Sequence, residues 1–231
     1  MIIAGIDIDL IKKDIKNLHL AVYPPDGRVR LAVPEGINES TLEMYVISKL
    51  SWIRRQQRFF IRQNRQSPRE YVNRESHYLF GRKYLLRIHE VSSIRKPIIE
   101  LKSKNHIDMT VPTNATIEKR QKAMDTWYRE QLRGILDELV PKWESVLKVK
   151  ANSVKVYAMR TKWGSCNTDN KNIMFNVELA KKPVKCIEYV IVHELAHLLD
   201  KKHGDVFHAI MNRHLPNWRQ LRDELNEIVM E

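Results

Sequence analysis

The strongest constraint on this chain is an apolar segment that carries two histidines and a glutamate, YVIVHELAHLL (189–199). On an α-helix, residues four apart differ by about 40° of rotation, so His193 and His197 project from one face and can bind one metal ion. Glu194 is rotated by about 100° from His193, which places it beside a metal-bound water rather than on the metal. An unpaired carboxylate in so apolar a run is unfavourable, and a nearby cation would relieve it. The pattern predicts a hydrolytic metal site with Glu194 as general base.

A third metal ligand is expected nearby, because catalytic zinc is commonly held by three protein side chains and one water. His203 follows His197 after five intervening residues, enough for the chain to leave the helix and fold back. His208 and His214 are the alternatives, although both are expected on a later helix. Cys186 could close a structural site, but it would lie roughly 10 Å along the helix axis from the first histidine. The predicted ligands of Zn²⁺, or of another divalent metal such as Ni²⁺, are His193, His197 and His203.

The chain is strongly basic, with 40 Lys and Arg against 28 Asp and Glu and a formal net charge of +12. Such a surface favours anionic partners, including nucleic acid, nucleotides and acidic peptides. Much of the excess lies in 54–74, where arginines recur mostly three or four positions apart: Arg54, Arg55, Arg58, Arg62, Arg65, Arg69 and Arg74. This run is either a solvated helix face or an anion-binding patch. No zinc finger or phosphate-binding loop accompanies it, so the sequence does not decide between the two. Nucleic acid is therefore an open partner, beside a peptide or nucleotide substrate.

No targeting signal or membrane segment is apparent. The chain lacks the roughly 18 consecutive apolar residues of a membrane span. In residues 1–16 the apolar residues precede the lysines and alternate with aspartate, unlike a signal peptide. The only cysteines are Cys166 and Cys186, so disulfides are not expected and a reducing cytoplasm is the predicted location.

Hydrophobic periodicity divides the chain into strands and helices. In the first part, strands are predicted at 6–11, 18–23 and 29–33, then a helix over 37–63 and strands within 77–91, 97–102 and 106–112. In the second part, a helix over 114–145 is kinked or ended by Pro141, strands at 154–159 and 172–179 flank a loop, and helices follow at 183–199 and 217–229. We expect an α+β fold without internal repeats, in which an antiparallel β-rich part over 1–112 precedes a catalytic part over 113–231.

Five motifs in the last third carry a family resemblance: RTKWGSC (160–166), NIMFNVELAKKP (172–183), IEYVIVHELAH (187–197), KHGDVF (202–207) and LPNW (215–218). In this order they resemble the YgjP-like family of predicted metal-dependent hydrolases, which is related to SprT-type and other zincin metallopeptidases. The resemblance implies a minimal, gluzincin- or SprT-like zincin domain with the HExxH helix packed on a small sheet. It also implies metal ligands at His193, His197 and His203, with Glu194 as the base.

Two departures and one alternative accompany this resemblance. Gly204 stands where the family often has serine, and His208 stands at a usually aromatic position. The spacing from His193 to His203 also imitates the metzincin pattern, with Asp200 in place of its turn glycine. No Met-turn is recognisable, because Met211 lies in a predicted helix, so the metzincin fold stays a minor alternative.

Further residues near these motifs have candidate roles. In zincins an edge strand pairs with extended peptide, and 172–179 is the predicted strand, with Asn176 either contacting substrate or satisfying backbone groups. Arg160 and Lys162 either bind a carboxylate, phosphate or oxyanion, or form surface ion pairs. Asp200 and Asp205 are candidate hydrogen-bond partners of a ligand histidine. Cys166 has no identified base beside it, so a nucleophilic role is not expected for this thiol.

Four functions remain open at this point. The leading one is a zinc metallopeptidase in which Glu194 activates a metal-bound water. The first alternative is a nucleoside triphosphate pyrophosphatase, or phosphoanhydride hydrolase, that uses the same metal site. The others are a nucleic-acid-associated protease-like protein and a purely structural metal module, which would need a closed coordination sphere.

Overall fold

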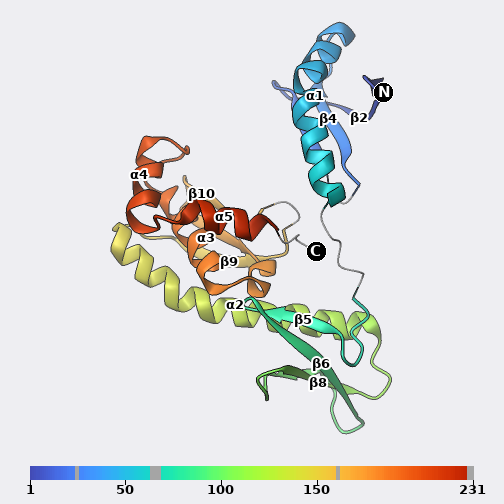
Figure 1. Ribbon diagram of the computed structural model, residues 1–231, viewed down its shortest axis with the longest axis vertical. Helices are drawn as coiled ribbons and strands as arrows, with labels where there is room; N and C mark the ends of the chain where they lie inside the picture. The colour runs from blue at the N-terminus through green and yellow to red at the C-terminus, as the bar shows by residue number, and fades with distance from the viewer. Residues whose placement is uncertain (24–25, 63–68, 160–161, 228–231) are drawn as a thin grey trace. The chain divides into compact units, whose positions relative to one another are not determined.

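A computed structural model describes residues 1–231 except 24–25, 63–68, 160–161 and 228–231 (Figure 1). The protein is a mixed α+β structure of small sheets and helices, as predicted. Its contacts divide it into two compact units, Met1–Arg65 and Gln66–Glu231, whereas the sequence placed the boundary between 112 and 113. The physical reason is that the strands before residue 112 share one hydrophobic core with the long helix that follows them. Within the described part of the chain, no helix is long and apolar enough to cross a membrane.

Unit 1 consists of one sheet and one helix. Its strands β1 (Ile2–Ile3), β2 (Ile6–Lys13), β3 (His19–Tyr23) and β4 (Arg28–Pro34) lie in the order β1-β2-β4-β3. The predicted antiparallel sheet is wrong in one respect, because β2 and β4 run parallel. β3 folds back antiparallel onto one edge of β4 and leaves the other edge for β2. Helix α1 (Glu39–Arg62) contributes Leu42, Val46 and Ile53 to the buried core of this unit.

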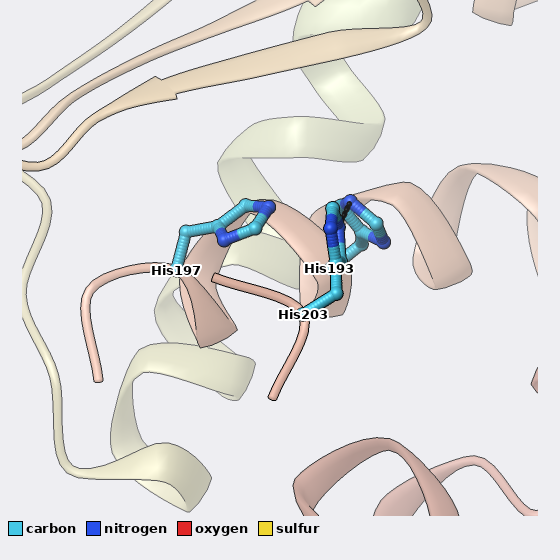
Figure 2. A group of neighbouring side chains, drawn as sticks. All are labelled: His193, His197 and His203. Atoms are coloured by element: carbon cyan, nitrogen blue, oxygen red, sulfur yellow. Dashed lines mark hydrogen bonds between the residues drawn. The ribbon is translucent and has the colours of Figure 1, made fainter. Parts of the chain in front are cut away.

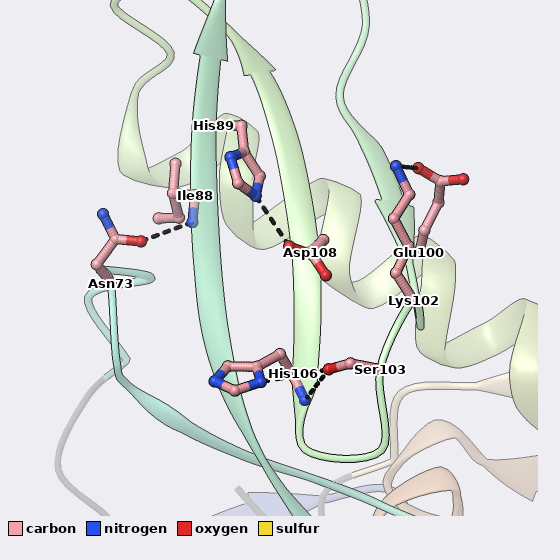
Figure 3. A network of polar contacts seen from close by, with 8 residues as sticks. All are labelled: Asn73, Ile88, His89, Glu100, Lys102, Ser103, His106 and Asp108. Carbon is pink, nitrogen blue, oxygen red and sulfur yellow. Dashed lines mark hydrogen bonds and ion pairs between the residues drawn. The ribbon is translucent and has the colours of Figure 1, made fainter.

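Unit 2 begins with a second sheet of the same kind. Its strands β5 (Ser76–Leu79), β6 (Arg82–Val91), β7 (Ile98–Glu100) and β8 (His106–Pro112) lie in the order β5-β6-β8-β7. β6 and β8 are parallel, and a hydrogen bond of 2.8 Å joins His89 of β6 to the largely buried Asp108 of β8 (Figure 3). Helix α2 (Ile117–Leu147) follows and continues through Pro141, so of the two alternatives for that proline, a kink or an end, the end is wrong.

The two sheets with their helices form an internal repeat that the sequence analysis missed. β8 begins at residue 106 and β4 at 28, and α2 begins at 117 and α1 at 39, so both pairs are 78 residues apart. The first turns also match, because Ala4–Gly5 (φ 49° and 78°) and Phe80–Gly81 (φ 48° and 81°) both have positive φ at two successive residues. Two-residue hairpin turns of this kind suit the twist of the flanking strands. The shared residues are too few to be visible as a sequence repeat.

A three-stranded sheet supports the last third of the chain. Its strands β9 (Ser153–Tyr157), β10 (Gly164–Asn167) and β11 (Asn172–Asn176) lie in the order β10-β11-β9. The predicted strand over 172–179 ends at Asn176, because the Asn176 side chain accepts from the amide of Glu178 and starts a short 3₁₀ helix, η1 (Val177–Lys181). The predicted loop before it contains β10. The edges of this sheet are therefore β10 and β9, and the predicted edge strand, β11, is central.

Three helices complete unit 2: α3 (Val184–Ala196), α4 (Asp205–His214) and α5 (Trp218–Glu227). α3 packs against α2, α4, α5 and β10. Its apolar side chains are almost fully enclosed, among them Ile187, Ile191 and Leu195, each with no exposed surface. Because α3 is anchored on several sides, the polar residues at its C-terminal end are held in fixed positions.

Candidate metal centre

Three histidines converge at the end of α3 (Figure 2). His193 lies in the last turn of α3, His197 is its C-cap, and His203 comes from the loop before α4. The Nε2 atoms of His193 and His203 are 3.2 Å apart, and one ligand nitrogen from each histidine lies within 4.8 Å of the other two. Zinc–nitrogen bonds are about 2.0–2.1 Å long, so nitrogens bound to one tetrahedral ion are separated by roughly 3.4 Å. The three side chains therefore have the spacing of a single metal site.

A phenylalanine that the sequence analysis assigned no role packs against these rings. Phe207 of α4 is 1% exposed, and its ring centroid lies 5.0 Å from His193, 5.2 Å from His197 and 4.6 Å from His203. It stacks on His197 and meets the other two rings edge-on. Phe207 thus forms an apolar wall that limits where each imidazole can turn.

The loop that returns His203 to α3 is organised by Asp200. The Asp200 carboxylate accepts from the amides of Lys202 (3.0 Å) and Phe207 (3.2 Å). Its backbone carbonyl lies 3.2 Å from Nδ1 of His197, which leaves Nε2 of that ring for a metal. Asp200 therefore contacts a candidate ligand, as predicted, although through its carbonyl. Asp205 is exposed in the first turn of α4, and no bond from it to a histidine is found in the described residues.

The electrostatic environment favours the neutral form of His193 and His197. Burial, together with the neighbouring His197 and His203, lowers the pKa of His193 to about 3. Burial also lowers the pKa of His197. A neutral imidazole offers a lone pair to a metal, whereas a protonated one does not. The donor set fits a divalent transition metal.

Glu194 is buried between α3 and β10, with 5% of its surface exposed. Burial raises its pKa to about 7, against the opposing effects of Lys162 and the backbone amide of Cys166. Gly164 makes room for it, since a Cβ at 164 would lie only 2.7 Å from Oε1 of Glu194. The glycine of the WGSC motif thus has a steric function beside the carboxylate. A carboxylate with a pKa near neutrality is suited to accept and return a proton.

The three histidines and Glu194 line a cavity of about 460 Å³. Strand β10, helix α3 and helix α5 form its walls, and its remaining lining is Lys162, Trp163, Gly164, Ser165, Cys166, Thr168, Tyr189, Val190, Lys201, Arg222, Leu225 and Asn226. Tyr189 lies one turn before His193, and the two ring centroids are 5.8 Å apart. Burial raises the pKa of Tyr189 to about 12, so its hydroxyl is a hydrogen-bond donor at neutral pH. Its spacing of four residues from His193 was the sequence signal that could have identified it.

The predicted substrate residues have different positions. Lys162 lines the cavity, and Arg160 lies outside the described residues. Asn176 is fully buried, and its amide bonds the backbone of Met159 and Lys162 as well as Glu178. The hypothesis that Asn176 contacts substrate is therefore corrected: its side chain holds the segment before β10 onto the sheet.

The alternative ligands lie elsewhere. His208 stacks on Trp218 with 5.8 Å between ring centroids, and the ring of His214 is 6.0 Å from that of Trp143. Cys186 is fully buried in the core. None of the three belongs to the histidine cluster identified among the described residues.

The role of the other cysteine is also limited by its environment. Burial, followed by the charge of Glu194, raises the pKa of the Cys166 thiol to about 11. A thiol in this state carries little thiolate at neutral pH, and the thiolate is the nucleophilic form. The geometry thus gives no support to thiol catalysis in this cavity.

Comparisons with known proteins identify the family of this chain. A search of curated sequences returned no match. Among solved structures, the chain is similar to the metallopeptidase zymogen abylysin of Pyrococcus abyssi, at 15% identity over 42% of this chain and 99% of that one, with a TM-score of 0.38. It is also similar to the zymogen jannalysin of Methanocaldococcus jannaschii, at 18% identity over 39% and 92%, with a TM-score of 0.36. A family model described as the YgjP-like metallopeptidase domain matches residues 16–228, and the chain therefore belongs to the YgjP-like family of metal-dependent hydrolases.

Proposed function

We propose that this protein is a zinc metallopeptidase whose ion is held by His193, His197 and His203 and whose general base is Glu194. The observation that carries the proposal is that three metal-compatible imidazoles and one buried carboxylate line the same cavity. Within the described residues the group comprises three ligands, which leaves one position for water in a tetrahedral site. That arrangement favours a catalytic over a purely structural metal.

The chemistry divides between the metal and the chain. A bound divalent ion supplies Lewis-acid polarisation and lowers the pKa of water to about 7. Glu194 takes a proton from the attacking water and delivers it to the leaving amine. The close contact with Gly164 and the bond from the Cys166 amide hold the carboxylate in one orientation during this transfer.

Substrate binding is assigned to strand β10. It is one of the two edge strands of its sheet in the described residues, and Gly164, Ser165 and Cys166 of β10 line the cavity. An extended peptide can add to such an edge through main-chain hydrogen bonds. This pairing would place a scissile bond across the cavity from α3 without any requirement for a particular side chain.

Two side chains that line the cavity support a role in stabilising negative charge that develops on the substrate. The Tyr189 hydroxyl forms no hydrogen bond with another described residue, and its ring packs edge-on against His193. Lys162 is close enough to Glu194 to lower the pKa of that carboxyl. We assign both as hydrogen-bond donors to the oxyanion of the transition state.

Phosphoanhydride hydrolysis is the second candidate, because three cationic side chains line the cavity: Lys162, Lys201 and Arg222. Their charges suit a nucleoside triphosphate as well as an acidic peptide. Lys201 pairs with the exposed Asp169, and Arg222 with the adjacent Asp223. These exposed pairs are weak enough for a phosphate to compete with them.

One experiment separates the two candidates. Zinc-loaded protein is incubated with a peptide library and, separately, with a nucleoside triphosphate panel, and products are measured by mass spectrometry and phosphate release. We expect peptide cleavage that a chelator abolishes and zinc restores. Phosphate or pyrophosphate release without peptide cleavage would overturn the peptidase proposal in favour of the second candidate. Inactivity of the zinc-loaded protein on both panels would contradict both.

A further inference from the structure

Helix α1 carries an uninterrupted concentration of positive charge. Between Glu43 and Glu70 the chain has no acidic residue, but it has one lysine and six arginines. Three of these arginines lie on the described part of α1 with exposed side chains: Arg54, Arg55 and Arg58. These three charges therefore belong to a fixed helix surface.

These arginines share one face of the helix. With Ser51 they occupy positions i, i+3, i+4 and i+7, which project from the same side. The core residues Leu42, Val46 and Ile53 project from the opposite side. A hollow of about 460 Å³ is lined by Ser51, Arg54, Gln57 and Arg58.

A contact between Gln57 of α1 and the sheet of unit 1 fixes the position of the arginine face. The Gln57 side chain donates to the carbonyl of Gly27, at 3.0 Å, in the turn between β3 and β4. A Cβ at Gly27 would lie 2.9 Å from the Gln57 side chain, so helix and turn are in close contact. The helix thus presents its cations from a fixed position on the sheet of unit 1.

In the part of the chain that the structure describes, no acidic side chain pairs with these cations. Among the described residues, Arg54, Arg55 and Arg58 form no ion pair or hydrogen bond with another side chain or with the backbone. Like charges three or four positions apart destabilise a helix. The cluster therefore works against the stability of α1, which points to a role in binding.

The internal repeat offers a comparison for this face. Positions 78 residues after Arg54 and Arg58 are Leu132 and Leu136 of α2, which are 0% and 2% exposed. In the second copy these two leucines are part of the hydrophobic core that α2 shares with α3. The positions that match Ser51 and Arg55 are the exposed Arg129 and Arg133, so the copies differ at Arg54 and Arg58, where exposed cations stand in place of core leucines.

We propose that the face formed by Ser51, Arg54, Arg55 and Arg58 binds the phosphate backbone of nucleic acid. Arginine exceeds lysine here, and guanidinium groups bind phosphate through two parallel hydrogen bonds. The Ser51 hydroxyl adds a neutral donor of the kind that contacts phosphates. Exposed apolar side chains, Met44 and Ile47, lie before Ser51 on the same side of α1, so the assignment to nucleic acid rests on the arginine content of the face.

The test measures binding of the full-length, zinc-loaded protein to a fluorescent 20-base-pair DNA duplex, a 20-nucleotide RNA strand and polyglutamate. The variant R54Q/R55Q/R58Q removes three charges from the face. The control K12Q/K13Q/K16Q removes three charges from exposed lysines in and after β2 of the same unit. Anisotropy titrations at several salt concentrations, with circular dichroism to verify folding, give affinities and salt slopes.

We expect duplex or single-stranded nucleic acid to bind at least about tenfold more tightly than polyglutamate at 0.1 M salt. The arginine variant should weaken that binding at least about tenfold, and its slope of log K against log salt should be shallower by about two to three units on DNA. The lysine variant should change the affinity less than about threefold. Equal effects of the two variants, equal binding of polyglutamate, or no binding to either nucleic acid would overturn the proposal. None of these outcomes depends on hydrolytic activity.

Discussion

Gly164 and Glu194 are in such close contact that a Cβ at position 164 would lie 2.7 Å from Oε1 and 2.8 Å from Cγ of the carboxylate. A side chain cannot be added there without moving Glu194. We expect G164A to bind zinc normally and to lose at least about 100-fold in kcat, since catalysis is sensitive to displacements of about 1 Å. Measuring the kcat and the zinc content of G164A tests this expectation.

The matched control is G134A, on the exposed side of α2, where a Cβ meets no atom within 4 Å. It should keep full activity and gain stability, by up to about 1 kcal/mol, because alanine favours helix over glycine. If G164A were as active as G134A, the proposed position of the base would be incorrect.

Removing the Asp200 carboxylate should weaken metal binding. Its two bonds to backbone amides shape the loop that carries His203 and Phe207. We expect D200A to reduce zinc affinity about 10- to 100-fold, as is typical for groups that support metal ligands. Competition with a chromophoric chelator measures this affinity. D205A, at the exposed start of α4, should change it less than about threefold; equal losses in both variants would contradict the assigned role of Asp200.

The raised pKa of Cys166 predicts slow alkylation. Because its folded-state pKa is about 11, above that of a free thiol, the reactive thiolate is scarce until the pH approaches 11. In metal-free C186A, where Cys166 is the sole thiol, iodoacetamide should react at pH 8.5 at least about tenfold more slowly than with N-acetylcysteine. The rate should rise toward pH 11, and a midpoint below pH 8 would instead indicate an activated thiol.

The hydroxyl of Tyr189 should contribute to kcat more than to KM, because we assign it to the transition-state oxyanion. Y189F should lower kcat about 10- to 1000-fold while zinc content and melting temperature change little. Binding of a phosphinic dipeptide, a tetrahedral mimic, should weaken in parallel. Y157F, on an exposed tyrosine at the end of β9, serves as the control. An unchanged kcat together with a lowered melting temperature would make Tyr189 a packing residue.

The helices and most strands could be predicted from the sequence because their periodicity is local. The spacing of His193 and His197 also placed two candidate ligands on one face, and the five motifs identified the family. β10 could not be predicted, because a four-residue strand has too short a pattern and exists through its pairing with β11. The parallel pairing of β2 with β4 depends on contacts between distant segments in the same way.

Several side-chain contacts of the site could not be predicted from the sequence, because they depend on tertiary packing. Nothing local shows that Phe207 lies against three imidazoles or that Gly164 faces Glu194. Asn176 had two readings from sequence, and only its complete burial distinguishes a structural amide from a substrate contact. The predicted boundary between 112 and 113 differs from the division by contacts, because strand composition before residue 112 does not indicate which helix covers the sheet.

The central claim is that Glu194 is the base in a site that binds metal without it, and E194Q tests this directly. Wild type and E194Q are loaded with zinc, dialysed, and compared for metal content by mass spectrometry and for cleavage of the same peptide library. We expect one zinc per chain in both proteins and at least about 1000-fold slower cleavage by the variant, because glutamine cannot accept the proton. Comparable cleavage by zinc-loaded E194Q would contradict it.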